Sequence, residues 1–266
     1  YSEQIVAALK KAKYCPDEEL IYSKDFGVPQ IRPRVIFYAH DCREEAPSAD
    51  FFDALKKSRN RFLQSKRLPT DRPVWVREAI SDLRKKHGTE PLIDDESPAG
   101  FERGRYGPEE SGFQQSLRGG ARLNEAPNSH RFVRHRTATR NRFANIFEQI
   151  EKGKIPRGVQ LSASHRATFK IGKQVVVPLE GDQVGHTLTT LPDDYLHYEE
   201  PRILTPREYA RLQTFPDSFV LRGPYTTGGH RRKLECPRYT QIGNAVPPLL
   251  SEALALTLMT LMKNEK

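Results

Sequence analysis

The sequence predicts an α/β partial domain that carries a second, mostly irregular α+β domain. Two features at the ends of the chain predict the α/β part. The opening stretch has the order helix, strand, turn, strand, and a long apolar helix begins near Pro247 and Pro248. The middle of the chain predicts the irregular part, because its short apolar runs are separated by many glycines, prolines and charged residues.

The opening stretch predicts a helix with Ile5, Val6 and Leu9 on one face, followed by a buried strand at residues 35–38. One helix and two short strands cannot cover both faces of a sheet, since a parallel sheet needs several βα units. We therefore expect residues outside this sequence to complete the sheet. The first residue is Tyr1 rather than methionine, which favours a start inside a longer gene product.

Two helices are expected in the middle of the chain. The first spans residues 73–88, with a basic last turn and Gly88 as its end, and the second ends at Gly153. The forty or so residues after Gly88 predict a long loop or mobile segment, and residues 159–191 predict short strands, notably at 175–177. The apolar faces of the two helices are Val76, Ala79, Ile80 and Leu83, and Phe143, Ile146, Phe147 and Ile150.

A helix-start signal stands at residues 204–209. Thr205 is expected to be the N-cap, Pro206 lies at the first helical position, and Glu208 can bond back to the cap. Leu204 and Tyr209 occupy the positions of a hydrophobic staple. The last helix is apolar nearly all round, which predicts burial of Leu249, Leu250, Leu254, Leu258 and Met259.

Composition narrows the class of protein. Only 36% of the residues are hydrophobic, 29% are charged, and the net charge is +9, so a polyanion such as nucleic acid is the natural partner. Basicity that serves only solubility is the alternative. Cys15, Cys42 and Cys236 are odd in number and far apart, which predicts a reducing, intracellular compartment. We find no signal peptide and no apolar run of membrane-spanning length, and the eight histidines lack metal-ligand spacing, so no membrane and no metal are expected.

Three segments carry a family resemblance. They are FGVPQIRPR at 26–34, RILTPREYARLQTFPD at 202–217 and YTQIGNAVPP at 239–248. Together and in this order they resemble the eighth, ninth and tenth motifs of the cytosine-5 DNA methyltransferases. The long segment between the eighth and ninth motifs is where this family keeps its target-recognition domain.

The resemblance implies a partial Rossmann-like, S-adenosylmethionine-dependent methyltransferase domain plus an α+β target-recognition domain. Residues 1–55 would end the catalytic domain, 56–200 would form the recognition domain, 201–242 the ninth motif and hinge, and 243–266 a helix that returns to the catalytic domain. Double-stranded DNA is the implied partner and S-adenosyl-L-methionine the implied cofactor. A bacterial restriction–modification setting follows, with a cytoplasmic protein associated with the nucleoid through DNA.

The chain also departs from the family. The nucleophilic cysteine of a Pro-Cys motif, the glutamate of Glu-Asn-Val and the Gly-rich first motif are all absent from the sequence. These motifs precede the eighth in the usual order. We therefore expect an N-terminal catalytic portion that carries the nucleophilic cysteine, either as a separate subunit or as a removed segment, and no activity from this chain alone.

The eighth motif implies the catalytic residues. Arg34 would donate to O2 of the flipped cytosine, where attack at C6 pushes electron density. Arg32 and Gln30 would support that strand or contact the DNA backbone and the active-site wall. The alternative for Arg34 is a strand-edge arginine that pairs with a surface carboxylate.

The tenth motif implies the cofactor residues. Asn244, Ala245 and Val246 would line the pocket for the amino-acid end of S-adenosylmethionine. The alternative for Asn244 is a cap on the final helix, and both roles can hold together.

The resemblance and the charge pattern suggest the DNA contacts. Arg231, Arg232 and Lys233 are phosphate candidates, with a flexible basic loop as the alternative. Thr187 and Thr189 resemble a family stretch near DNA, although threonines are often simply strand formers. Arg207 and Arg211 of the ninth motif are expected to have a structural role and to lie near the DNA backbone. The residues that read bases stay open, with candidates throughout 131–173.

Two other functions compete with a methyltransferase portion. One is a non-catalytic DNA-binding module or regulator derived from such an enzyme. The other is an RNA cytosine methyltransferase of related fold, which the long segment between the eighth and ninth motifs argues against. The target sequence and the oligomeric state cannot be derived from the sequence.

Overall fold

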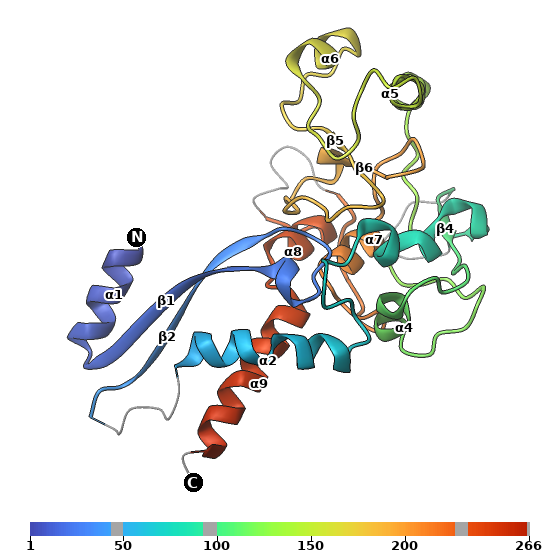
Figure 1. Cartoon of the computed structure of the whole chain (residues 1–266). Helices are drawn as coiled ribbons and strands as arrows, with labels where there is room; N and C mark the ends of the chain where they lie inside the picture. Colours follow the sequence, from blue (N-terminus) through green and yellow to red (C-terminus); the bar gives the residue numbers. More distant parts are fainter. Residues whose placement is uncertain (44–49, 93–99, 227–233, 265–266) are drawn as a thin grey trace.

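The computed structural model describes residues 1–43, 50–92, 100–226 and 234–264. The chain opens with a helix and a long antiparallel hairpin that projects from the body (Figure 1). The predicted order of elements is confirmed. The prediction of a buried strand is wrong, because every residue of the second strand is at least partly exposed and Val35 is 45% exposed. The elements are α1 (Ser2–Lys11), β1 (Tyr14–Tyr22), η1 (Ser23–Phe26) and β2 (Pro33–Asp41).

The hairpin register brings two cysteines together. Cys42 N–H donates to the carbonyl of Lys13 at 3.0 Å, two residues from Cys15. Cys15 and Cys42 form a disulfide with their Cα atoms 5.3 Å apart. The prediction of a reducing compartment assumed that cysteines far apart in sequence stay unpaired. This assumption is wrong for Cys15 and Cys42, because strand register decides which residues meet.

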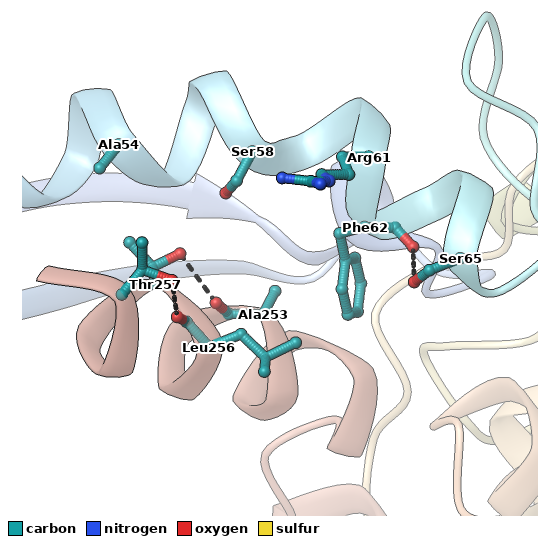
Figure 2. A pocket seen from close by; sticks show the side chains of 9 residues that line it. Ala54, Ser58, Arg61, Phe62, Ser65, Ala253, Leu256 and Thr257 are labelled. Carbon is teal, nitrogen blue, oxygen red and sulfur yellow. Dashed lines mark hydrogen bonds between the residues drawn. The ribbon is translucent and has the colours of Figure 1, made fainter. Parts of the chain in front are cut away.

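Helices α2 (Phe51–Ser65) and α9 (Pro248–Asn264) pack against each other below the hairpin (Figure 1). Asp50 caps α2 by accepting from the N–H of Asp53 at 2.8 Å. A hollow of about 340 Å³ remains between the two helices, and Ser58 and Phe62 of α2 face Leu256 and Thr257 of α9 across it (Figure 2).

Helix α9 is less buried than its sequence predicts. Leu249 and Leu250 are buried in the core, but Leu258 is 41% exposed and Met259 is 52% exposed. By length and composition alone, the segment at residues 238–263 is long and apolar enough to cross a membrane, contrary to the prediction that no such segment exists. A break in the helix and the packing against α2 argue for a core element, because one helix ends at Asn244 and α9 begins only at Pro248.

The predicted helix over residues 73–88 is broken into pieces. Its four apolar residues are buried as expected, but Arg84 is extended, with φ −66° and ψ 144°. The break allows the side chain of Asp82 to lie in the core beside Arg211, and its carbonyl to accept from Gly107. The pieces are α3 (Val76–Ile80), η2 (Ser81–Leu83) and η3 (Lys85–His87).

The segment predicted to be a long loop contains regular elements. Strands β3 (Thr89–Pro91) and β4 (Glu102–Gly104) form a short antiparallel pair, and α4 (Gly112–Arg118) follows. Phe113 and Leu117 of α4 are buried in the main core. Two apolar residues four apart were too weak a signal to predict this helix.

A second, smaller core supports a lobe at the end of the molecule away from α2 and α9 (Figure 1). Helix α5 (Thr137–Glu151) is confirmed, and it buries Phe143, Ile146 and Phe147 in this core. The predicted strands at 159–191 are mostly wrong, because Val176 packs into the small core and Val177 into the main core without long pairing partners. The region contains α6 (Ala163–Thr168) and β5 (Val177–Pro178), and it is followed by η4 (Pro192–Asp194) and β6 (Tyr195–Leu196).

Helix α7 (Pro206–Leu212) begins as predicted. The hydroxyl of Thr205 accepts from the N–H of Glu208 at 3.3 Å, and the carboxylate of Glu208 accepts from the N–H of Thr205 at 2.7 Å. Leu204 and Tyr209 are fully buried beside this cap. The short helix α8 (Arg238–Asn244) then packs on α7 and leads into α9.

Candidate functional site

The segment before β2 meets distant parts of the chain in a buried junction. Ile31 N–H donates to the carbonyl of Gly185 at 2.9 Å, and Gly185 N–H donates to the carbonyl of Pro29 at 3.0 Å. On the other side, a Cβ on Gly243 would lie 2.2 Å from the carbonyl oxygen of Thr189. Only glycine allows this close approach of α8 to the 185–189 segment.

Gln30 holds the junction through its side-chain amide. The residue is fully buried, and its Nε2 donates to the carbonyl of Leu212 at 2.8 Å and also contacts Oε1 of Gln213. Its Oε1 accepts from the N–H of Leu188 at 3.1 Å. Of the two roles expected for Gln30, the structure places it in the supporting one, since an amide with these partners is not available to DNA.

Arg32 ties the junction to the turn between α8 and α9. Its Nη2 donates to the carbonyls of Gly243 at 2.9 Å and Ala245 at 2.8 Å, and the residue is 2% exposed. Burial, followed by the nearby charge of Arg34, lowers the pKa of Arg32 to about 10. The guanidinium is still charged at neutral pH, and its partners are carbonyl dipoles rather than a carboxylate. Arg32 is therefore a positioning residue of this turn.

Arg34 has a different environment, although it lies only two residues away. It is half-exposed on β2, and its Nη1 donates to the carbonyl of Pro33 at 2.6 Å. Within the described part of the chain it forms no ion pair, so the alternative of a surface salt bridge is not observed. Its remaining donors are available to a ligand.

The two predicted threonines use their hydroxyls inside the protein. Thr187 accepts from the backbone N–H of Arg32 at 3.1 Å, and Thr189 donates to the carboxylate of Asp194 at 2.6 Å. Both residues therefore position the segment that packs under α8. The predicted phosphate contacts at Arg231, Arg232 and Lys233 lie outside the described residues.

Comparison with known proteins decides the family. A model of the C-5 cytosine-specific DNA methylase family matches residues 1–260. The chain belongs to this family. Its members take the transferred methyl group from S-adenosylmethionine, as the resemblance of the eighth, ninth and tenth motifs implied.

Individual relatives are methyltransferases too, and their lengths show how much of such a protein this chain spans. Two type II methyltransferases are each 29% identical to the chain: M.Bpa9945I of Bacillus paralicheniformis over 243 residues, and M.DdeI of Desulfomicrobium norvegicum over 242 residues. Each match covers 87% of this chain, with 48% of the first relative and 51% of the second. The chain thus spans about half the length of these curated relatives.

A solved structure confirms the fold class. A prophage-encoded Escherichia coli protein described as a DNA modification methyltransferase superposes with a TM-score of 0.59 at 20% identity. The match covers 98% of this chain and 64% of that one. At this level of identity the likeness is one of fold, and it supports the α/β methyltransferase architecture predicted from the sequence.

The predicted cofactor residues form the turn between α8 and α9. Asn244 is exposed and Val246 is 57% exposed, while the carbonyl of Ala245 accepts from Arg32. The expected capping role of Asn244 is filled instead by Thr214, whose hydroxyl accepts from the N–H of Leu249 at 3.1 Å. The backbone here is held by these bonds, and it presents the side chains of Asn244 and Val246 to solvent.

A buried charge network under α7 was not predicted. Arg211 is fully buried, and its guanidinium donates to Asp217 at 2.6 and 2.5 Å, to Asp82 at 3.3 and 3.1 Å and to the carbonyl of Ala79 at 3.0 Å. Burial raises the pKa of Asp82. Burial also acts to raise the pKa of Asp217, but the adjacent guanidinium of Arg211 outweighs it, and that pKa is lowered.

Arg207 and Arg211 of the ninth motif are thus both structural. Arg207 is also fully buried and donates to the carbonyls of Asn128 and Phe219, each at 2.8 Å. The structural role expected for Arg207 and Arg211 is confirmed, and neither buried guanidinium is available to a DNA phosphate. Their proximity to the DNA backbone remains a prediction. An available sequence signal was Asp217, an acidic residue six positions after Arg211 in the same motif.

No group of three or more His, Cys, Asp or Glu side chains that could hold a metal ion occurs among the described residues. That no metal takes part in the function remains a prediction.

Proposed function

We propose that this chain is the C-terminal, sequence-recognising portion of a DNA (cytosine-5-)-methyltransferase. It transfers methyl groups to C5 of cytosine in duplex DNA only together with an N-terminal portion that carries the nucleophilic cysteine. The junction around Arg32 carries this proposal. It joins the eighth, ninth and tenth motif segments in a sequence that has no Pro-Cys, Glu-Asn-Val or Gly-rich first motif.

The proposed domain boundaries follow from this assignment. Residues 1–55 and 243–266 belong to the catalytic domain, 56–200 to the recognition domain, and 201–242 to the ninth motif and hinge. Gln30 and Arg32 join the first part of the catalytic domain to the ninth motif and to the final segment, since they bond to residues 212–213 and 243–245. Packing of α2 against α9 keeps the start of the proposed recognition domain close to the catalytic part.

Arg34 is the residue of this chain proposed to touch the reacting base. When a thiolate adds to C6 of cytosine, electron density moves through the ring toward O2 and N3. A preorganised guanidinium at O2 stabilises that charge more in the transition state than in the bound substrate. The half-exposed guanidinium of Arg34, bonded only to its neighbouring carbonyl among the described residues, supports this role.

Asn244 and Val246 are proposed to contact the amino-acid end of S-adenosylmethionine, which supplies the methyl group when bound. The carbonyls that hold their turn in place belong to Gly243 and Ala245 and accept from Arg32. A helix start also offers free N–H groups that favour a carboxylate. The remaining walls of the pocket must come from the N-terminal portion, because the Gly-rich turn is absent from this sequence.

An exposed apolar surface is the proposed docking face for that portion. Every residue of α1 is at least partly exposed, and Leu20 of β1 and Val35 of β2 are 49% and 45% exposed. Leu258 and Met262 of α9 are exposed as well, at 41% and 59%. Such residues gain about 25 cal/mol for each Å² that a partner removes from water.

A non-catalytic DNA-binding module derived from such an enzyme is the alternative. The test is transfer of a radiolabelled methyl group from S-adenosylmethionine to duplex DNA. We expect no incorporation by the purified chain and incorporation after co-expression with the N-terminal portion. Incorporation by the chain alone would refute the need for a partner. Inactivity of the assembled pair, with DNA binding retained, would favour the module, and transfer to tRNA in the same assay would favour an RNA enzyme.

A further inference from the structure

One segment of the chain accounts for the net positive charge of the protein. Residues 131–173 contain 11 Lys and Arg and two Asp and Glu, so this segment alone has a net charge of +9, equal to that of the whole chain. The other 223 residues contain 32 basic and 32 acidic residues and are neutral overall. The segment forms α5 and α6 with their connections, on the lobe built around the small core (Figure 1).

Two arginines of this lobe lie where the helix dipole disfavours positive charge. Arg136 is the N-cap of α5 and Arg140 lies in the first turn, where the partial positive charge of the helix disfavours cations. The first turn, Thr-Ala-Thr-Arg, has no acidic residue to offset them. Among the described residues, Arg134, Arg136, Arg140 and Arg142 form no ion pair. Their charge is therefore available to a polyanion from outside the protein.

A hollow of about 550 Å³ lies between α5 and α6 in the same lobe, and polar side chains line part of it. Asn145 and Gln149 line it from α5, and since they are four residues apart they share one face of the helix. His165 of α6 and Lys154 line it as well. Within the described part of the chain, none of these four side chains makes a hydrogen bond or ion pair, in contrast to the bonded amides of Gln30 and other buried residues.

The helix that carries the two amides has a fixed backbone. Phe143, Ile146 and Phe147 anchor the opposite face of α5 in the small core. Rigid support matters because a side chain distinguishes bases only when its donor and acceptor are held in register with the base edge. Asn145 is exposed and Gln149 is half-exposed, so both amides can reach a ligand in the hollow.

We propose that Asn145 and Gln149 read base edges in the major groove of the target DNA, while the unpaired arginines of α5 bind the phosphates. A carboxamide presents a donor and an acceptor side by side, which matches N7 and the amino group of adenine. An exposed α-helix also fits the width of the major groove. The two residues therefore specify A·T pairs beside the target cytosine. This inference rests on the proposed function and adds to it the residues that determine sequence.

Selection of duplexes from a random pool by the purified chain tests base reading without methyl transfer. The wild-type chain is expected to enrich a sequence with at least one A·T pair that Asn145→Ala or Gln149→Ala no longer enriches. The loss of discrimination at that position should be roughly 5-fold to 150-fold. Gln115→Ala is the matched control, because Gln115 is an exposed amide on α4, outside the lobe.

Methylation mapping in cells that co-express the N-terminal portion gives the second readout. The variants should methylate additional sites that differ from the original target at the same position. Enrichment and methylation patterns identical to wild type would overturn the proposal. So would an equal fall at every sequence, which indicates a change in affinity alone. Absence of methylation by the wild-type pair would count against the proposed function, and the selection experiment would still decide the role of the two amides.

Discussion

Replacement of Arg211 by alanine is expected to be among the most destabilising changes in the chain. The guanidinium bonds to Asp82 and Asp217, whose side chains are 0% and 2% exposed. After its removal, Asp82 keeps Arg118 at 3.7 Å, and Asp217 keeps Arg207 at 3.7 Å and the hydroxyl of Tyr106 at 2.6 Å. Two buried carboxylates would then have only these weaker partners to balance their negative charge.

The magnitude follows from what breaking a buried ion pair costs. Removal of one partner typically destabilises by about 3–5 kcal/mol, because the other charge stays buried without its counterion. A domain has a total free energy of unfolding of about 5–15 kcal/mol, so the loss would be a large fraction of it. By comparison, Arg77→Ala breaks a pair with Asp182 whose members are 44% and 55% exposed, and should cost about 1 kcal/mol or less.

Urea unfolding followed by tryptophan fluorescence measures the difference, since Trp75 is the only tryptophan and directly precedes α3. Arg211→Ala should unfold at a much lower urea concentration than Arg77→Ala. If the variant does not fold, Asp82→Asn provides a milder test, because it keeps the shape and removes one buried charge. The reasoning is refuted if Arg211→Ala shifts the midpoint no further than Arg77→Ala does.

Three other predictions concern catalysis, pH and assembly. Arg34→Ala in the assembled enzyme should lower the single-turnover methylation rate roughly 100-fold to 1000-fold with little change in the Kd for DNA, whereas equal losses would indicate a positioning contact. Burial, followed by the charge of Arg202, lowers the pKa of both His130 and His197 well below the ordinary value. The unfolded chain therefore takes up protons first, and stability should fall by about 1.4 kcal/mol per pH unit for each histidine as the pH drops below about 6.5. Urea unfolding across this range checks the slope, which His197→Gln should reduce by about 1.4 kcal/mol per pH unit; an unchanged slope would count against His197. Leu258→Asp should leave the unfolding midpoint of the chain unchanged and weaken co-elution with the N-terminal portion, and unaltered co-elution would exclude this face of α9.

Local chemistry explains which parts of the fold the sequence predicted. The start of α7 depends on groups within four residues, Thr205 to Glu208, so its cap was predicted position by position. The apolar stripe of α5 likewise needs only the helical period. In contrast, the helix predicted over residues 73–88 is broken because Asp82 meets Arg211, a residue 129 positions away in the chain.

The candidate site divides in the same way. The sequence by itself determined the family, through three ordered motifs, and nominated Arg34 and Asn244 within them. Only the tertiary structure distinguished the neighbours Arg32 and Arg34, one bonded to the carbonyl of Gly243 across 211 residues and the other open to a ligand. It also paired Cys15 with Cys42 and buried Arg207 and Arg211. The physical reason is that burial and partners depend on segments distant in sequence, whereas residue type and spacing report only what lies within a few turns of the chain.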